Sequence, residues 1–331
     1  MEAATQPETT RGAGSLARAV RDTFRDRPWA WSFAAAALVW VVTYLETSRG
    51  FFGNLTSAAA VSSFLVIVGI GQLFVITTGN GNIDLSIPNT MTLAGYYGLS
   101  VMNGHNSALL TGILVALVVG LAIGAANIVA IFVLQIPPIV GTLAVGFIAQ
   151  SASFVKSNDF TANPSPALAH FVNATLLGLP LLALCVIVLA VLAWILLSRT
   201  IYGRSVQAIG QSLRAAHLSG VRVRRTVALA YLLSGVLAGL AGVLLAADSG
   251  GVQLDIATPY LLNSIAVVVL GGSLISGGRS FIAGVWGAGM LLTLLVTLLT
   301  VLNIPVASQN VVKGLLIVAV LSLAGGKAKE A

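Results

Sequence analysis

Long apolar segments separated by short polar ones dominate the pattern of this chain. No Asp, Glu, Lys or Arg occurs between Ser86 and Val155 or between Phe160 and Ser198, and several other windows are equally uncharged. Because about 20 apolar residues cross a hydrocarbon core of about 30 Å, such windows predict membrane-spanning helices. The chain has few aromatic residues and no alternating polar and apolar strands, so the pattern does not favour a transmembrane barrel.

Turn-forming residues divide the apolar windows into predicted spans. These are 29–45, 58–78, 88–103, 108–134, 138–155, 172–197, 226–247, 259–275, 281–302 and 306–323. The span 108–134 is unusually long and 259–275 is bordered by glycine pairs, so either can be broken or re-entrant. We therefore predict an all-α integral membrane protein with about ten transmembrane helices and possible broken or re-entrant segments.

Two spans carry small-residue faces that would allow helices to approach closely. Gly120 and Gly124 are four residues apart in one span, and Gly235, Gly239 and Gly242 share a face of another. Small residues at this spacing let the backbones of membrane helices touch, so we expect both faces to serve in packing.

Composition and charge strengthen the membrane prediction and add an orientation. Only 8% of the 331 residues are charged and the mean hydropathy is +0.97, which excludes an ordinary soluble enzyme. Lys and Arg are retained on the cytoplasmic side of membranes. If the N-terminus is cytoplasmic, 14 of the 17 basic residues lie inside, only Arg49 and Lys156 lie outside, and Lys313 lies within a span. We attribute the pI of about 10.0 to this topology and not to a nucleic-acid partner. We also expect both termini to lie in the cytoplasm.

The domain organisation follows from the same pattern. We expect a cytoplasmic tail over residues 1–28, a transmembrane domain over 29–323 with a cytoplasmic loop over 198–225, and a second cytoplasmic tail over 324–331. Apolar positions at every fourth residue from Leu16 to Phe24 predict a short amphipathic helix on the membrane surface, with a solvated tail as the alternative. The single cysteine, Cys185, can form neither an internal disulfide nor a cysteine-based metal site.

The sequence contains no recognisable catalytic or nucleotide-binding constellation. The three histidines, His105, His170 and His217, lie in separate loops, and no His or acid pair sits at helical spacing within a span. The glycine-rich stretch 272–280 lacks a Lys directly after its second glycine, which a phosphate-binding loop requires. We therefore expect a protein that is not an enzyme, holds no metal and binds no ATP by itself.

Polar side chains inside the spans are candidates to line a path for a solute. Amide side chains occur in or beside the predicted spans at Gln72, Asn89, Asn127, Gln150, Asn263, Gln309 and Asn310. Unpaired amides are costly in lipid, so each should face a pathway or hydrogen-bond between helices.

Few ionisable groups lie near the middle of the membrane. Asp84 and Lys313 are the two candidates. Asp84 or Ser86, ahead of Pro88, could cap a helix as readily as serve a pathway. Snorkelling, or pairing with a helix end or a carboxylate, would explain Lys313, with contact to a substrate as the alternative.

The loop 198–225 carries six Arg and no acidic residue. Its apolar residues recur at roughly helical spacing at Val206, Ile209, Leu213, Ala216 and Leu218. This predicts a short amphipathic cytoplasmic helix whose apolar face docks on another polypeptide, because no other cytoplasmic part of this chain is available. A helix lying on anionic lipid is the alternative.

Four groups of segments, spread over residues 60–320, form a recognisable pattern. They are Gly81-Asn-Ile-Asp-Leu-Ser86 with Leu93-Ala-Gly95; Thr200-Ile-Tyr-Gly-Arg204 with Ala208-Ile-Gly210; Ala215-Ala-His-Leu-Ser-Gly-Val221 with Leu233-Ser-Gly-Val-Leu-Ala-Gly-Leu-Ala-Gly242; and Ile265-Ala-Val-Val-Val-Leu-Gly-Gly-Ser-Leu-Ile-Ser-Gly-Gly-Arg279 with Val312-Lys-Gly314. In this order they resemble the permease subunits of the ribose/xylose/arabinose branch of bacterial ABC sugar importers. Two positions depart from the family pattern. Arg214 stands where Glu is common, and the first segment has Gly-Asn-Ile-Asp where Gly-Gly-Ile-Asp is usual.

The resemblance implies a transport subunit of the bacterial inner membrane that carries a monosaccharide or similar polar solute by alternating access. Its implied partners are cytoplasmic ATPase subunits that bind ATP and Mg, a second permease copy, identical or paralogous, and a periplasmic sugar-binding protein. The chain is also expected to contact membrane lipid. The residues implied in coupling to the ATPase are Leu213, Arg214, Ala215, Ala216, Leu218 and Gly220. We expect structural or gating roles for Asp84, Ser86, Arg279 and Lys313. An ATP-independent secondary carrier or channel is the alternative function.

Overall fold

The computed structural model describes residues 27–47, 50–158, 160 and 162–325. Its elements in chain order are α2 (Ala30–Thr47), α3 (Phe51–Thr77), α4 (Ile87–Met102), the short 3-10 helix η2 (Asn106–Ala108), α5 (Leu109–Ile128), the π-helical η3 (Val129–Val133), α6 (Pro138–Ser157), α7 (Pro166–Asn173), strands β1 (Thr175–Leu176) and β2 (Leu179–Pro180), α8 (Leu181–Arg199), α9 (Ile201–Gln211), α10 (Leu213–Leu218), α11 (Val223–Asp248), α12 (Tyr260–Leu270), α13 (Ile282–Val301) and α14 (Val306–Gly325). The predicted amphipathic helix over 15–26 lies outside the described residues.

The predicted all-α membrane architecture is confirmed. Each of the ten predicted spans coincides with one helix, namely α2 to α6, α8 and α11 to α14. Within the described residues, seven of the helices are long and apolar enough to cross a membrane. Of the other three, α4 has 16 residues and α12 has 11, so neither is long enough to cross as a straight helix.

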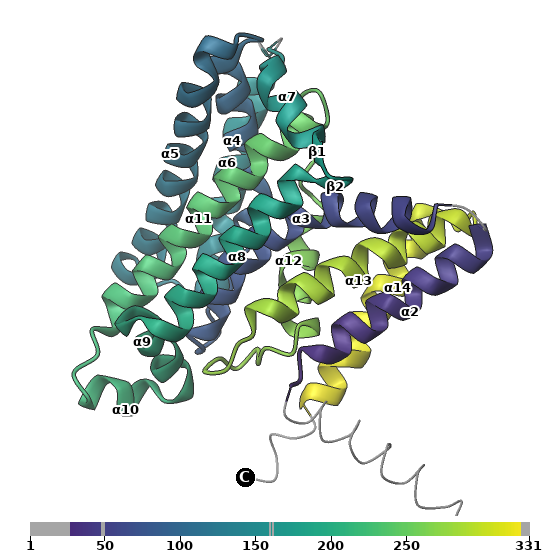
Figure 1. Ribbon diagram of the computed structural model, residues 1–331. Coiled ribbons are helices and arrows are strands. Elements are labelled where there is room, and N and C mark those ends of the chain that lie inside the picture. Colours follow the sequence, from purple (N-terminus) through teal and green to yellow (C-terminus); the bar gives the residue numbers. More distant parts are fainter. Residues whose placement is uncertain (1–26, 48–49, 159, 161, 326–331) are drawn as a thin grey trace, which may run out of the picture.

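The helices form two groups that diverge in Figure 1. In one group α11 packs along α4 and α5, and α4 also packs on α6. In the other group α13 packs against α2 and contacts α12 and α14. Helix α3 contacts α11 on one side and α12 and α13 on the other, so it joins the two groups.

The small-residue faces of α5 and α11 meet each other, as the sequence predicts. A Cβ at Gly120 would collide with the carbonyl oxygen of Gly235, and a Cβ at Gly235 would collide with that of Gly120. One turn away, a Cβ at Gly239 would collide with the carbonyl of Ala116. These backbones therefore pack directly on one another, which holds α5 and α11 together as one unit.

Irregular backbone occurs near the ends of the two spans that the sequence marks as possibly broken, 108–134 and 259–275, and in the connection between α3 and α4. The helix over 109–133 ends in the π-helical turn η3, and the chain then turns at Gln135, whose φ is 55°. Helix α12 ends at the glycine pair Gly271-Gly272. Between α3 and α4 the chain turns at Gly79-Asn80-Gly81, where all three φ values are positive, and residues 82–86 run without regular structure before α4 begins.

Three predicted boundaries are wrong. The span 58–78 begins seven residues after the start of α3, and the span 259–275 ends five residues after the end of α12. The span 172–197 begins too early, because residues 166–173 form the separate helix α7 and residues 175–180 form a β-hairpin. The hairpin turns at Leu177 and Gly178, whose φ values are 54° and 80°. Leu177 is apolar yet exposed, so hydropathy alone could not mark this turn.

Most arginines of the described chain gather at one end of the bundle, whereas Lys156 at the end of α6 and Lys313 in α14 lie elsewhere. Arg199 at the end of α8 and helices α9 and α10, with Arg204 and Arg214, lie at the bottom of Figure 1, beside the start of α11 and the α12–α13 connection that carries Arg279. We call this the basic end, and we call the end with α7 and the hairpin the opposite end.

Candidate functional site

A cavity of about 890 Å³ lies toward the opposite end, between the two groups of helices. Its wall includes Val61 and Leu65 of α3, Leu245 and Ser249 of the α11 end, Tyr260 and Asn263 of α12, Thr293, Thr297 and Thr300 of α13, Asn303 of the following turn, and Gln309, Asn310 and Lys313 of α14. We call it the polar cavity. Amide and hydroxyl groups on an otherwise apolar wall are typical of a site for a small polar molecule.

Four residues that the sequence singled out meet in the polar cavity. They are Asn263, Gln309, Asn310 and Lys313. Gln309 is only 5% exposed, and its Nε2 donates to the carbonyl of Ile304 at 2.9 Å and to the Thr300 hydroxyl at 3.2 Å. Gln309 therefore fixes the turn between α13 and α14, whereas Asn310 is exposed and free of this role.

Tight packing closes the polar cavity toward the basic end. One turn below the lining residues Leu65 and Asn263, Gly69 of α3 faces Val267 of α12 and Val285 of α13. A Cβ at Gly69 would lie 2.7 Å from Val267 Cγ2 and 2.8 Å from Val285 Cγ1, so the three helices are in direct contact at this level. This contact forms the floor of the cavity between α3, α12 and α13.

A second set of predicted residues gathers around a buried carboxylate instead. Asp84 is only 2% exposed and accepts four hydrogen bonds. Its Oδ1 accepts from the Ser86 amide at 3.0 Å, the Ser86 hydroxyl at 2.6 Å and Asn127 Nδ2 at 3.3 Å, and its Oδ2 accepts from the Ser234 hydroxyl at 2.7 Å. The amide of Asp84 donates to Gln72 Oε1 at 3.3 Å. These five residues, Gln72, Asp84, Ser86, Asn127 and Ser234, form what we call the Asp84 cluster.

The Asp84 cluster fastens the connection between α3 and α4 to its surroundings. Ser86 directly precedes α4, but its hydroxyl donates to Asp84 and does not cap the helix. Nearby, the Thr142 hydroxyl donates to the Ile83 carbonyl at 3.1 Å and accepts from the Leu85 amide at 3.1 Å. The cluster therefore links α3, α5 and α11, and Gln72 and Asn127 lie in it and away from the polar cavity.

Sequence reasoning missed two members of this region. Ser234 and Tyr231 lie one turn apart on α11. The Ser234 hydroxyl donates to Asp84, and the Tyr231 hydroxyl donates to Asn82 Oδ1 at 3.1 Å. A lone hydroxyl in an apolar span gives no signal of its partner, so neither residue could be selected from the sequence.

The remaining predicted residues stand apart from the polar cavity. The side chain of Asn89 lies against Gly146 of α6, and Gln150 is half-buried one turn further along α6. Arg279 is exposed at the basic end, with its guanidinium 5.2 Å from the centre of the Phe281 ring.

The predicted single amphipathic helix of the 198–225 loop is wrong. The chain forms two helices, α9 and α10, because Ser212 is extended and its hydroxyl accepts from the Ala215 amide at 3.3 Å to begin a new helix. Val206, Ile209 and Ala216 are buried within this chain, so its own core provides the surface that was assigned to another polypeptide.

Two leucines of the loop remain exposed. Leu213 is 45% and Leu218 is 78% exposed, at the two ends of α10. Arg214, Ala215 and Gly220 are also exposed, and Gly220 has a φ of 82°. Beside α10 a cavity of about 610 Å³ is lined by Leu213, His217, Gly220, Val221, Arg222, Val223, Arg224 and Arg225. The outer surface of α10 is thus apolar with a basic border.

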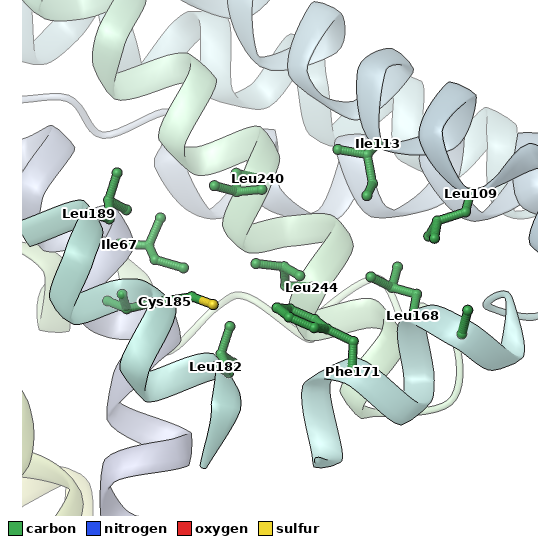
Figure 2. Close-up of a pocket in the computed structure, with 12 residues that line it drawn as sticks. Ile67, Leu109, Ile113, Leu168, Phe171, Leu182, Cys185, Leu189, Leu240 and Leu244 are labelled. Carbon is green, nitrogen blue, oxygen red and sulfur yellow. The ribbon is translucent and has the colours of Figure 1, made fainter. Parts of the chain in front are cut away.

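A third cavity, of about 410 Å³, has a wall unsuited to a polar solute. Figure 2 shows it between α3, α5, α7, α8 and α11, with Cys185 among leucine, isoleucine and phenylalanine side chains. Because its wall offers almost no hydrogen-bonding group, the polar cavity is the better candidate for a polar solute.

The fold and these sites define a polytopic helical membrane protein built for transport. Residues 54–321 match the family described as branched-chain amino acid transport system / permease component, and the chain belongs to this family. It is 31% identical over 294 residues to the autoinducer 2 import system permease protein LsrC of Enterobacter sp. (strain 638), covering 88% of this chain and 84% of that protein. It is 32% identical over 273 residues to the galactofuranose transporter permease protein YtfT of Escherichia coli (strain K12), covering 82% and 79%.

A third relative is the ribose import permease protein RbsC of Escherichia coli (strain K12). It is 29% identical over 290 residues, which cover 86% of this chain and 89% of that protein. No solved structure matches the chain. The resemblance to sugar-importer permeases is thereby confirmed, and the chain is a transport permease subunit and not an enzyme.

Proposed function

We propose that this chain is the membrane-spanning subunit of an ATP-binding-cassette importer that carries a monosaccharide or a similar polar solute. The observation that carries the proposal is the polar cavity, which is closed toward the basic end by Gly69, Val267 and Val285. A cavity that faces one side and is closed toward the other corresponds to one state of an alternating-access cycle. Relatives that import ribose and transport galactofuranose support the sugar class.

The wall of the polar cavity suits a neutral, hydroxyl-rich solute. Asn263, Asn303 and Asn310 each offer both donors and acceptors, and three threonines add hydroxyls. A few hydrogen bonds of about 0.5–1.5 kcal/mol net each would orient such a solute without trapping it. Weak binding suits a site that must release what it carries.

The two ends of the bundle suit different partners. At the basic end, exposed Leu213 and Leu218 on α10 would dock on the ATPase subunit, which holds ATP and Mg. At the opposite end, a periplasmic sugar-binding protein would deliver the solute to the polar cavity. We place the chain in the bacterial inner membrane with both termini in the cytoplasm, because Lys and Arg are retained on that side, and we expect it to pair with an identical or paralogous copy.

Uptake into proteoliposomes tests the function. The chain is purified with its ATPase and binding protein, and labelled ribose or galactose is offered with and without ATP on the side of the basic end. We expect uptake that requires both ATP and the binding protein. Equal flux without ATP would contradict the proposal and support a secondary carrier or channel.

Co-purification tests the docking surface. In the variant Leu213→Asp with Leu218→Asp, the ATPase should no longer co-purify, because two charges replace the exposed apolar groups. The matched control is Leu177→Asp, which changes a leucine that is 97% exposed on the hairpin at the opposite end. If both variants retain the ATPase equally, α10 lies on anionic lipid and the docking proposal fails.

A further inference from the structure

Backbone atoms of three segments meet at the basic end with no side chains between them. Near the end of α9, a Cβ at Gly210 would collide with the carbonyl of Thr77, at the end of α3, and with the amide of Gly278, in the α12–α13 connection. A Cβ at Gly277 would lie 2.5 Å from the backbone of Gly79. We call these five residues, Thr77, Gly79, Gly210, Gly277 and Gly278, the glycine junction.

Hydrogen bonds tie the junction together. The Gly278 amide donates to the Thr77 carbonyl at 2.9 Å, and Gln211 Nε2 donates to the Gly278 carbonyl at 3.3 Å. Gly277 and Gly278 are buried, with φ values of 90° and 81° that side chains other than glycine rarely adopt. Direct backbone contact leaves no flexible side chain to absorb a displacement, so α9 and the α12–α13 connection should move as one body.

The segments that meet in the junction lead directly to the helices that close the polar cavity. Helices α3, α12 and α13 close it at Gly69, Val267 and Val285. Helix α3 ends in the junction at Thr77, and Gly277 and Gly278 lie in the connection that joins α12 to α13. Gly69 is eight residues from Thr77, a distance of about 12 Å along an α-helix. At its other side, the junction continues from α9 through Ser212 into α10, the element with the exposed leucines.

We propose that the glycine junction transmits the displacement of α10 to the three helices that close the polar cavity, with Gly210 as a positioning residue. This inference rests on the proposed function and adds the internal route by which an event at the basic end reaches the cavity. Gly210 acts through the helices that it touches, because it lies in neither the cavity nor the exposed surface of α10.

The variant Gly210→Ala tests the proposal in the reconstituted complex. Its methyl group must push α9 away from Thr77 and Gly278, whereas Leu213 and Leu218 remain unchanged. We expect normal co-purification with the ATPase, retained ATP hydrolysis, and a fall in solute carried per ATP of about tenfold, within the usual range of coupling between sites. The matched control is Gly53→Ala, a helical glycine with open space around it, which should leave this ratio unchanged.

A second variant keeps the proposal falsifiable if Gly210→Ala does not fold. Gln207→Cys and Ser276→Cys, both beside one cavity of about 650 Å³ and neither in the junction, are joined by a short bifunctional thiol reagent in a Cys185→Ser background. Because α9 and the connection move together, cross-linking should leave ATP-driven uptake unchanged. Loss of uptake on cross-linking, or full coupling in a folded Gly210→Ala variant, overturns the junction. A wild-type complex without ATP-dependent uptake contradicts the proposed function instead.

Discussion

Replacing Asp84 should separate the hydrogen-bonding role of its carboxylate from the role of its charge. The side chain is buried in the membrane part of the bundle and accepts four hydrogen bonds, all from neutral donors. Asp84→Ala removes all four acceptor contacts and leaves buried donors unpaired. Asp84→Asn keeps one oxygen, which can still accept the three bonds now made to Oδ1, and its new amide can donate to the Ser234 hydroxyl.

The number of hydrogen bonds and their typical energies give the expected losses of stability. Hydrogen bonds between membrane helices average about 0.6 kcal/mol and reach about 1.7 kcal/mol, whereas bonds to charged groups in soluble proteins contribute about 1.5–3 kcal/mol. Four bonds at about 1.5 kcal/mol give a loss of about 6 kcal/mol for Asp84→Ala. For Asp84→Asn, three weakened bonds cost about 2 kcal/mol, which is partly offset because no charge has to be buried.

Thermal unfolding in detergent, followed by the loss of the monodisperse chromatographic peak, measures this difference. We expect Asp84→Ala to lower the midpoint by more than about 10 °C or to prevent folding, and Asp84→Asn to lower it by about 5 °C or less. Ser234→Ala, which removes one donor at 2.7 Å, should lie close to Asp84→Asn. Equal midpoints for Asp84→Ala and the wild type would refute the reasoning, because the cluster would then contribute nothing to stability.

Three further predictions concern packing and exposure. Gly235→Leu should yield no monodisperse protein, because its side chain would displace the backbone of α5, whereas Gly53→Leu should behave as wild type; equal yields would contradict the close contact. Tyr231→Phe removes the bond to Asn82 and should lower the unfolding midpoint by a few degrees, for a loss of about 1 kcal/mol; an unchanged midpoint would contradict that bond. The exposed thiol of Cys185, inside the apolar span of α8, should react with a membrane-permeant maleimide and resist a charged one in vesicles; equal rates with both reagents would place it in water.

The sequence predicts the helices well because every helix that lies in lipid must be built mainly of apolar residues. Ten apolar windows correspond to ten helices, and turn-forming residues divide the charge-free runs where one run contains several helices. The rule fails over 172–180, where Leu176 and Leu177 are as apolar as a span yet lie in an exposed hairpin. Hydropathy reports the composition of a segment, and the turn at Gly178 depends on backbone conformation instead.

The candidate site is only partly predictable for a different reason. An amide in a span must find a partner, but the sequence does not say whether that partner is a solute or another helix. Asn263 and Asn310 lie in the polar cavity, whereas Asn127 faces Asp84 from 43 residues away in the chain. Such pairing depends on which helices are neighbours, and only the fold supplies that information.

The two polar sites together indicate which part of the bundle moves. The Asp84 cluster and the glycine contacts between Gly120 and Gly235 hold α3, α5 and α11 together by side-chain bonds and direct backbone packing. No comparable polar cluster occurs, among the described residues, between this unit and α13 or α14, and the polar cavity lies along that boundary. The group of α2, α12, α13 and α14 is therefore the one that can shift, because it is held to α3 mainly by apolar contacts, which resist sliding less than directional hydrogen bonds do. Since the α12–α13 connection is bonded to Thr77 and Gln211 at the basic end, the group would pivot there, and the shift would widen or narrow the cavity at its far side.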